Sequence, residues 1–233
     1  MTAPRSALVV GAGSAIGAAV VAALAADGFA CREWGRDPAR LGPDADRVDL
    51  RAPDQVEAAL SRLPDRLDAV VLAAGLFDWA PADEGDPDVW DELVMVNLAS
   101  AMRVTRGVLP RLLAAAPSSL VLIGSSAART AFAGNPAYVA SKHGLAGFAR
   151  SVFLDVRDRD VSVTLLSPGA RRSRGGAPGA RCAGRPAPAA GRRRRGRPLG
   201  RRDAATRVPG RDRPAAAAHP LTEGGTGRVS SWR

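Results

Sequence analysis

The alternation of two periodic patterns over residues 7–166 constrains the fold of this 233-residue chain more than any other feature. Short runs rich in Val, Leu and Ile alternate with longer stretches of helical spacing, which is typical of βαβ units and a parallel sheet. The pattern predicts strands over 7–10, 30–34, 47–49, 68–73, 119–124 and 161–166. It predicts helices over 15–27, 53–63, 87–98, 101–115 and 136–157.

Right-handed crossovers would arrange the six strands in the order 3-2-1-4-5-6. This is a doubly wound parallel α/β sheet of the Rossmann type, in which ligands bind beyond the carboxyl ends of the strands. The second strand fits this prediction least well, because Arg32 and Glu33 fall where a buried strand is expected.

Charge divides the chain into two parts. Residues 1–169 hold 16 basic and 20 acidic side chains, a net charge of −4, whereas residues 170–233 hold 17 and 3, a net charge of +14. Arg, Ala, Gly and Pro make up 48 of those last 64 residues, and such a composition cannot build a core. We therefore expect one dinucleotide-binding domain over 1–169 and a disordered basic tail over 170–233.

Two hypotheses concern this tail. Its four abundant amino acids have codons that begin with two G or C bases, so a GC-rich gene read out of frame near codon 170 would produce the mixture. The four arginines at 192–195 also suggest a nucleic-acid patch. The tail lacks interleaved aromatic residues for base stacking, so we do not expect a nucleic-acid partner and keep nucleic-acid binding as a third reading.

The uncharged stretch over residues 7–26 imitates a signal peptide or a membrane span. Its glycines would weaken an apolar helix, whereas a strand, a turn and a helix give each glycine a role, so no membrane association is expected. Cys31 and Cys182 form no disulfide framework, which suits a cytoplasmic protein. His143 and His219 have no partners at ligand spacing, so no metal site is expected.

Glycines surround the predicted junction between the first strand and the first helix, in the sequence Val-Val-Gly-Ala-Gly-Ser-Ala-Ile-Gly over 9–17. A side chain at Gly11 or Gly13 would block a tight turn and the close approach of a pyrophosphate. The pyrophosphate would sit on the free N–H groups at the helix N-terminus. A turn that merely needs positive φ explains the same letters, but the βαβ context favours dinucleotide binding.

The end of the second predicted strand bears on the choice of cofactor. An acid is expected there for NAD, because a carboxylate accepts hydrogen bonds from the ribose hydroxyls and repels a 2′-phosphate. The chain has Gly35 and Arg36 instead, which favours NADP(H) and leaves NAD as the alternative. Asp49 could accept a hydrogen bond from the adenine amino group, although an Asx turn would explain this residue nearly as well.

The only tyrosine and the only lysine of the chain lie four residues apart, as Tyr138 and Lys142. On a helix this spacing puts both side chains on one face, where an ammonium favours the phenolate and assists proton transfer. Ser125 lies thirteen positions before Tyr138. Its hydroxyl could hydrogen-bond the substrate oxygen with which Tyr138 would exchange a proton. Asn97 lies in an apolar helical stretch, where its amide needs a buried partner.

From Ala7 to Gly169 these motifs resemble the short-chain dehydrogenase/reductase family. The resemblance implies an NAD(P)-dependent oxidoreductase acting on a carbonyl or alcohol. Tyr138 would be the general acid/base, Lys142 would favour its phenolate and hold the nicotinamide ribose, Ser125 would position the carbonyl, and Asn97 would complete a proton relay through a water. Gly11, Gly13, Ser14, Ile16 and Gly17 would line the pyrophosphate, Asp49 and Leu50 the adenine, Ala73, Ala74 and Gly75 the adenosine ribose, and Pro168 and Gly169 the nicotinamide.

The resemblance stops after Gly169, where the family continues with a nicotinamide-contacting element, a helix pair over the substrate and a seventh strand. We therefore expect the seventh strand to be missing and consider a cofactor-binding but inactive protein as the alternative function. Of the two adjacent serines we assign catalysis to Ser125 and capping or packing to Ser126. The helices over 101–115 and 136–157 often pair between subunits in relatives, which makes a homo-oligomer one alternative.

Overall fold

The computed structural model describes residues 4–43, 45–169 and 229–232, which belong to one compact unit. Of the predicted tail, only residues 229–232 are described. The arginines at 192–195 and Cys182 lie outside the described residues.

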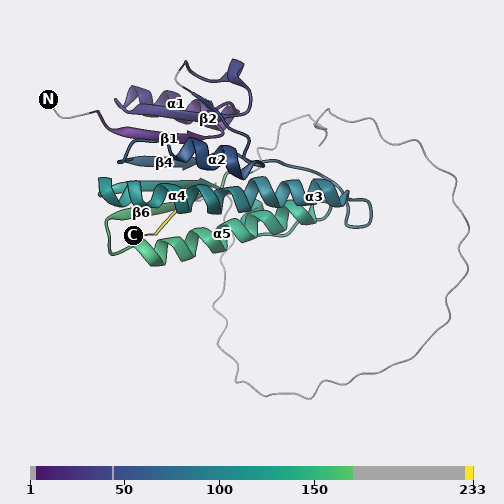
Figure 1. Ribbon diagram of the computed structural model, residues 1–233. Coiled ribbons are helices and arrows are strands. Elements are labelled where there is room, and N and C mark those ends of the chain that lie inside the picture. Colours follow the sequence, from purple (N-terminus) through teal and green to yellow (C-terminus); the bar gives the residue numbers. More distant parts are fainter. Residues whose placement is uncertain (1–3, 44, 170–228, 233) are drawn as a thin grey trace, which may run out of the picture. The chain divides into compact units, whose positions relative to one another are not determined.

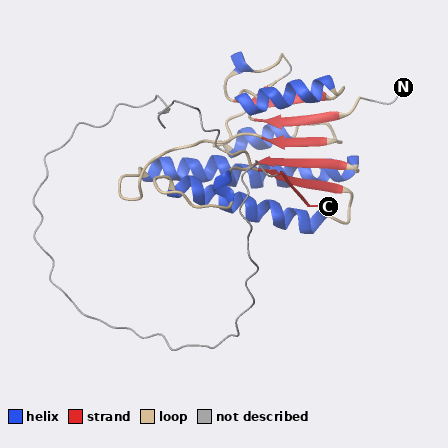
Figure 2. Cartoon of the chain, turned by 180° about the vertical axis from the view of Figure 1, so that it is seen from behind, coloured by secondary structure: helices blue, strands red, loops and turns tan. Residues whose placement is uncertain are grey.

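A single sheet forms the centre of this unit (Figure 2). Its first six strands pair in parallel in the predicted order 3-2-1-4-5-6, which confirms the Rossmann-type prediction. The strands are β1 (Ser6–Val10), β2 (Ala30–Gly35), β3 (Asp46–Arg47), β4 (Ala69–Leu72), β5 (Ser118–Ile123), β6 (Val161–Leu166) and β7 (Val229–Trp232).

The expectation that a seventh strand is missing is wrong. Residues Val229–Trp232 form β7, which pairs with β6 in antiparallel register from Val163 opposite Trp232 to Leu166 opposite Val229. The outer edge of β6 would otherwise present unpaired backbone groups. A four-residue segment that begins with Val and ends with Trp, both common in strands, is enough to pair with it, whatever the composition of the chain before it.

Helices cover the two faces of the sheet unequally. Figure 1 shows α2, α4 and α5 side by side on one face, and the view from behind in Figure 2 shows α1 on the other. The larger core cluster joins α2, α4 and α5 to the sheet. A smaller cluster joins Val20 and Leu24 of α1 to β4 and β5. The helices are α1 (Ala15–Ala26), α2 (Pro53–Leu60), α3 (Pro87–Val94), α4 (Ser100–Ala115) and α5 (Pro136–Val156).

The second strand shows why Arg32 and Glu33 are compatible with the fold. β3 pairs only with Trp34 and Gly35, so the first half of β2 is an open edge of the sheet. Arg32 is exposed there, and the carboxylate of Glu33 accepts a hydrogen bond from the Gly42 N–H at 3.1 Å.

Residues 87–115 are helical throughout, so the predicted break between residues 98 and 101 does not exist. A π-helical segment, η2 (Met95–Ala99), joins α3 to α4 and contains Asn97. Single π-helical turns inside α-helices frequently occur at functional sites, because they turn side chains out of the regular spacing. The other boundaries lie within three residues of the predicted ones.

Residues 7–26 form β1, the glycine turn and α1, so the strand–turn–helix reading of this stretch is confirmed. No helix among the described residues is long and apolar enough to cross a membrane.

Candidate functional site

The glycine turn between β1 and α1 leaves no room for side chains. Gly11 has a φ of +84°, and a Cβ there would lie 2.5 Å from the backbone nitrogen of Ala74 at the end of β4. A Cβ at Gly17 would collide with the Gly11 carbonyl oxygen, so this glycine lets the helix lie against the turn. One at Gly13 would lie 3.2 Å from the Cβ of Arg40. The predicted reason for glycine at 11 is therefore visible in the backbone, the nearest contact at Gly13 is with the Arg40 side chain, and the need for glycine at 17 is an additional finding.

The first turn of α1 presents unpaired donors. The hydroxyl oxygen of Ser14 caps the helix by accepting a hydrogen bond from the Gly17 N–H at 3.0 Å. The N–H groups of Ala15 and Ile16 have no acceptor within the helix, because the first four N–H groups of a helix never do. With the helix dipole they make this turn suitable for an anion such as a pyrophosphate.

A cavity of about 240 Å³ runs along the carboxyl ends of β1, β2 and β4. Its walls are mostly apolar and end at Gly75 and Leu76. Eight of the predicted cofactor residues line it, namely Gly11, Gly13, Ser14, Arg36, Asp49, Leu50, Ala74 and Gly75.

The other predicted cofactor residues lie around this cavity rather than in its wall. Ile16 has a side chain that is 43% exposed, whereas Gly17 is buried. Ala73 is buried, and its N–H donates to the Val10 carbonyl at 2.8 Å. Pro168 and Gly169 are exposed beyond β6, where the Pro168 carbonyl accepts from the Ser126 N–H at 3.3 Å.

Two arginines line the β2 end of the cavity. Arg40 lies in the short 3₁₀ helix η1 (Pro38–Arg40) and forms an exposed ion pair with Asp37 at 3.4 Å. Among the described residues Arg36 forms no ion pair, so its guanidinium is available to a ligand. The sequence reasoning did not single out Arg40, whose position depends on the 3₁₀ turn that follows Asp37.

Asp49 takes part in the Asx turn that was one of its two interpretations. Its carboxylate accepts from the backbone N–H of Arg51 at 3.0 Å and from the Arg51 Nε at 2.9 Å. These hydrogen bonds lower the pKa of Asp49. Arg51 also contacts Glu92 of α3 at 2.9 Å. The carboxylate of Asp49 is thus held in place at the cavity wall, with its charge partly neutralised.

Tyr138 and Lys142 lie on one face of α5, as predicted from their spacing. The Lys142 ammonium is 5.8 Å from the centre of the Tyr138 ring and donates a hydrogen bond to the Ile123 carbonyl at 3.1 Å. Only 4% of Lys142 is exposed, and this burial lowers the pKa of its side chain to about 8. Tyr138 is half-buried, with its ring in an edge-to-face contact with Phe77.

Asn97 has the buried partners that its position required. Its Oδ1 accepts from the Leu76 N–H at 2.7 Å, while its Nδ2 donates to the Leu76 carbonyl at 3.0 Å and to the Ser141 hydroxyl at 3.1 Å. The Ser141 hydroxyl in turn donates to the Tyr138 carbonyl at 2.8 Å. Asn97 therefore fastens the loop after β4 to the helix that bears Tyr138.

The cavity and these side chains meet at Gly75. A Cβ at that glycine would lie 3.3 Å from the Oδ1 of Asn97 and 3.5 Å from the Nζ of Lys142. A ligand in the cavity that extended past Gly75 would therefore reach Lys142. The site combines a cradle for an anionic ligand with a phenol, a buried ammonium and a fixed amide, a set of groups suited to proton transfer.

Ser125, rather than Ser126, is the capping residue of η3 (Ser126–Ala128), which corrects the predicted division of roles. The Oγ of Ser125 accepts from the Ala127 N–H at 3.2 Å, because Ser125 is the residue that precedes the 3₁₀ turn. A serine hydroxyl still has one O–H donor when it accepts such a bond. Capping therefore fixes the side chain without using the proton that a substrate oxygen would need.

Residues 5–177 match the short chain dehydrogenase family. The chain belongs to this family. Short-chain dehydrogenases are oxidoreductases that act on small molecules, and the match covers the whole of the candidate site.

In the part of the chain that the structure describes, no group of three His, Cys, Asp or Glu side chains could hold a metal ion.

Individual short-chain dehydrogenases resemble the chain moderately. It is 30% identical over 179 residues to a D-threitol dehydrogenase from Mycolicibacterium smegmatis, covering 70% of this chain and 69% of that protein. It is 28% identical over 182 residues to a D-beta-hydroxybutyrate dehydrogenase from Cupriavidus necator, covering 71% and 70%. Two fungal short-chain dehydrogenases from Penicillium brasilianum match over 49% of their length.

The solved structure of a short-chain dehydrogenase from Shigella flexneri, in complex with NADP, is 28% identical to the chain. The two superpose with a TM-score of 0.67 over 71% of this chain and 77% of the other.

Proposed function

We propose that the chain is an NADP-preferring oxidoreductase that interconverts a carbonyl compound and an alcohol, with Tyr138 as the proton donor and acceptor. The junction at Gly75 carries this proposal, because there the cavity meets Lys142 and Asn97. We also propose that the catalytic domain comprises residues 1–169.

The residues around the cavity suit an NADP molecule. The first turn of α1 would hold the pyrophosphate, the wall near Asp49 and Leu50 would hold the adenine, and Lys142 would hold the nicotinamide ribose. When bound, the cofactor supplies a hydride to the carbonyl carbon or accepts it back. The proposed preference for NADP over NAD rests on Arg36, whose guanidinium forms no ion pair within the described part of the chain and can donate to a 2′-phosphate in a bidentate manner.

The side chains around Tyr138 have separate roles in this proposal. The Tyr138 hydroxyl gives its proton to the substrate oxygen during reduction and recovers it during oxidation. The Ser125 O–H donates a hydrogen bond to the same oxygen and orients it. The Lys142 ammonium favours the phenolate that remains after proton transfer, and Asn97 holds the Tyr138 helix against the loop that ends the cavity.

A cofactor-binding protein without turnover is the second candidate. It is favoured by the family match, which ends at residue 177 and leaves roughly a third of the relatives' length without a counterpart. The elements that hold the cofactor all precede that point, so binding could persist without a complete substrate site.

A titration of thermal stability combined with turnover distinguishes these candidates. NADPH should raise the melting temperature of the full chain more than NADH, because a ligand that binds only the folded state stabilises it. Tyr138→Phe should keep this shift and lose turnover of a carbonyl substrate by about 10²- to 10⁴-fold. A shift with no turnover in the unsubstituted chain would favour the second candidate, and no shift with either cofactor would contradict both.

A further inference from the structure

Two aromatic side chains of the loop after β4 lie next to Tyr138. The Phe77 ring meets the Tyr138 ring edge to face, with centroids 4.8 Å apart and an angle of 78° between the rings. The Trp79 ring lies 6.2 Å from that of Phe77. Phe77 and Trp79, together called the aromatic wall below, remain 49% and 57% exposed.

The backbone before α5 fixes the position of Trp79. Gly134 has a φ of +81°, and a Cβ there would lie 2.7 Å from the Nε1 of Trp79. The indole therefore lies against the backbone four residues before Tyr138. This contact joins the loop after β4 to the loop that leads into α5, so the wall is anchored at both ends beside the proposed proton donor.

The chemistry of this wall differs from that of the rest of the site. Large aromatic surfaces that stay exposed beside polar functional groups are typical of ligand-binding sites. Aromatic rings pack favourably against other planar apolar groups, in stacked or edge-to-face arrangements. The one residue between the two aromatic positions is Asp78, which is partly exposed, so the loop that carries the wall bears a negative charge and is a poor partner for a substrate carboxylate.

We propose that Phe77 and Trp79 select the substrate, and that it is an uncharged ketone or aldehyde with an aromatic or similarly planar apolar substituent, or the corresponding alcohol. The inference rests on the proposed function. In the reduction, NADPH provides the hydride that forms the new C–H bond, Tyr138 provides the proton to oxygen, and the C=O double bond becomes a CH–OH group. The Lys142 ammonium lies 5.8 Å from the centre of the Tyr138 ring, the Phe77 ring contacts the same ring, and the aromatic wall would contact the substituent of the substrate.

The test compares three alcohols as substrates of the full chain with NADP: 1-phenylethanol, D-threitol and D-beta-hydroxybutyrate. The unsubstituted chain should have the highest kcat/KM for 1-phenylethanol. Trp79→Ala should lower that value about ten-fold, mainly through KM, and change the value for D-threitol less than about two-fold. Trp79→Phe should retain most of the preference, because the ring remains. Equal losses for all three alcohols, or a preference for D-threitol, would overturn the inference.

A binding measurement gives an answer even if none of the alcohols is oxidised. Saturation-transfer difference NMR of 1-phenylethanol with the full chain should show contact with the phenyl protons, weakened in Trp79→Ala. The matched control is Phe29→Ala, an aromatic residue stacked on Arg5 at the amino end of β2, and it should leave the signal unchanged. An unchanged signal in Trp79→Ala, or none in the unsubstituted chain, would refute the aromatic wall. The NADPH thermal shift tests the proposed function separately.

Discussion

The cofactor half of the site is built mainly from backbone, whereas the catalytic half is built from side chains. At the glycine turn the decisive facts are a positive φ at Gly11 and the closeness of Ala74. Around Asn97 the decisive facts are four hydrogen bonds that link a loop, a π-helical turn and α5. In the first half a Cβ at Gly11 or Gly17 would collide with backbone atoms, while in the second half the loss of the Asn97 side chain would leave Leu76 without its partner.

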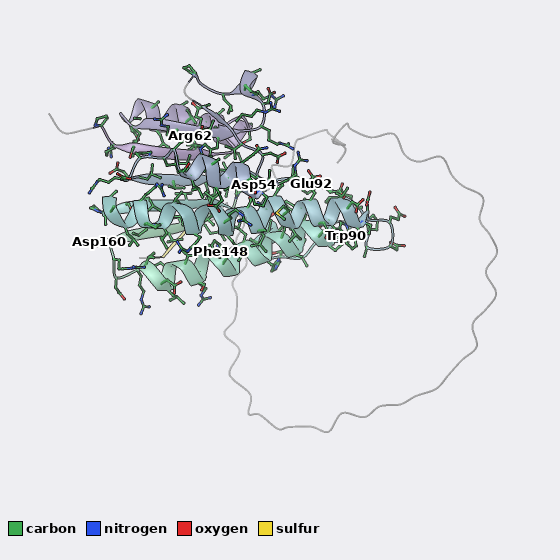
Figure 3. The ribbon with its side chains drawn as sticks, in the orientation of Figure 1. Asp54, Arg62, Trp90, Glu92, Phe148 and Asp160 are labelled. Carbon is green, nitrogen blue, oxygen red and sulfur yellow. The ribbon has the colours of Figure 1, made fainter. Side chains whose placement is uncertain are left out.

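The two halves also differ in where they lie along the chain. The turn and Arg36 come from one βαβ unit, while Asn97, Ser125 and Lys142 come from three separate elements. The helical layer that carries the second half extends along the sheet, with Asp160 at one end and Trp90 toward the other (Figure 3). Both halves nevertheless require the sheet to be assembled, because the turn at Gly11 packs against Ala74 after β4 and the cavity runs along the carboxyl ends of β1, β2 and β4.

Among variants of the cofactor half, Gly11→Ala should have the largest effect on stability and on NADPH binding. The new Cβ would lie 2.5 Å from a backbone nitrogen at a φ that alanine rarely adopts, so the free energy of unfolding should fall by about 4 kcal/mol or more. NADPH should no longer raise the melting temperature. Gly147→Ala is the control, because a Cβ in that part of α5 meets nothing within 4 Å. This substitution should raise the free energy of unfolding by about 0.5–1 kcal/mol. Urea unfolding of the two variants measures both effects.

Lys142 gives the catalytic half a dependence on pH that can be measured without cofactor. Burial lowers its pKa to about 8, so between about pH 8 and the ordinary lysine value the unfolded chain binds one more proton than the folded chain. The stability of the chain relative to Lys142→Met should therefore rise with pH in this window, by up to about 3 kcal/mol. A difference that stays constant from pH 7 to pH 10.5 would contradict the lowered pKa.

Asn97→Ala tests the network that fastens the Tyr138 helix. It leaves the N–H and carbonyl of Leu76 without their partner, and the expected loss of stability is about 2 kcal/mol. The control in the same helical layer is Thr105→Val, which removes a buried hydroxyl that has no hydrogen-bond partner among the described residues and should be neutral or slightly stabilising. If both variants unfold at the same urea concentration, the network contributes nothing to stability.

The smallest expected effect concerns Arg36. Arg36→Ala should weaken NADPH binding about ten-fold and leave NADH binding within about two-fold, because only NADPH carries the 2′-phosphate. Arg32→Ala, an exposed arginine in β2, should change neither affinity. Equal weakening for both cofactors would mean that Arg36 acts on a group that they share.

The strands and helices could be predicted from the sequence because they depend on local periodicity, and the strand order then followed from the right-handed crossover rule. The glycine turn could be predicted because its spacing of glycines is a local motif. The spacing of Tyr138 and Lys142 likewise fixed their shared helix face. The π-helical segment had no signal in the helical spacing, and the partners of its Asn97 could not be predicted, since Asn97 and Leu76 are 21 residues apart. Arg40 depends on a 3₁₀ turn, and β7 on an edge formed by β6, so neither has a local signal.

The aromatic neighbours of Tyr138 had no signal in the motifs either. Phe77 and Trp79 belong to no helix or strand, and their closeness to α5 depends on how the loop after β4 folds back. Ser125 was chosen by its spacing to Tyr138, but the spacing could not reveal that the same hydroxyl would cap η3. Contacts between loops that are far apart in the chain therefore leave no signal in the motifs.

That Tyr138 is the only tyrosine of the chain has a spectroscopic consequence. The near-ultraviolet absorption band of a phenolate differs from that of a phenol, and in most proteins several tyrosines overlap in this band. Here the whole change arises from one ring, which contacts Phe77 and lies 5.8 Å from the Lys142 ammonium. The ionisation of the proposed proton donor can therefore be read directly from the optical spectrum of the unlabelled chain.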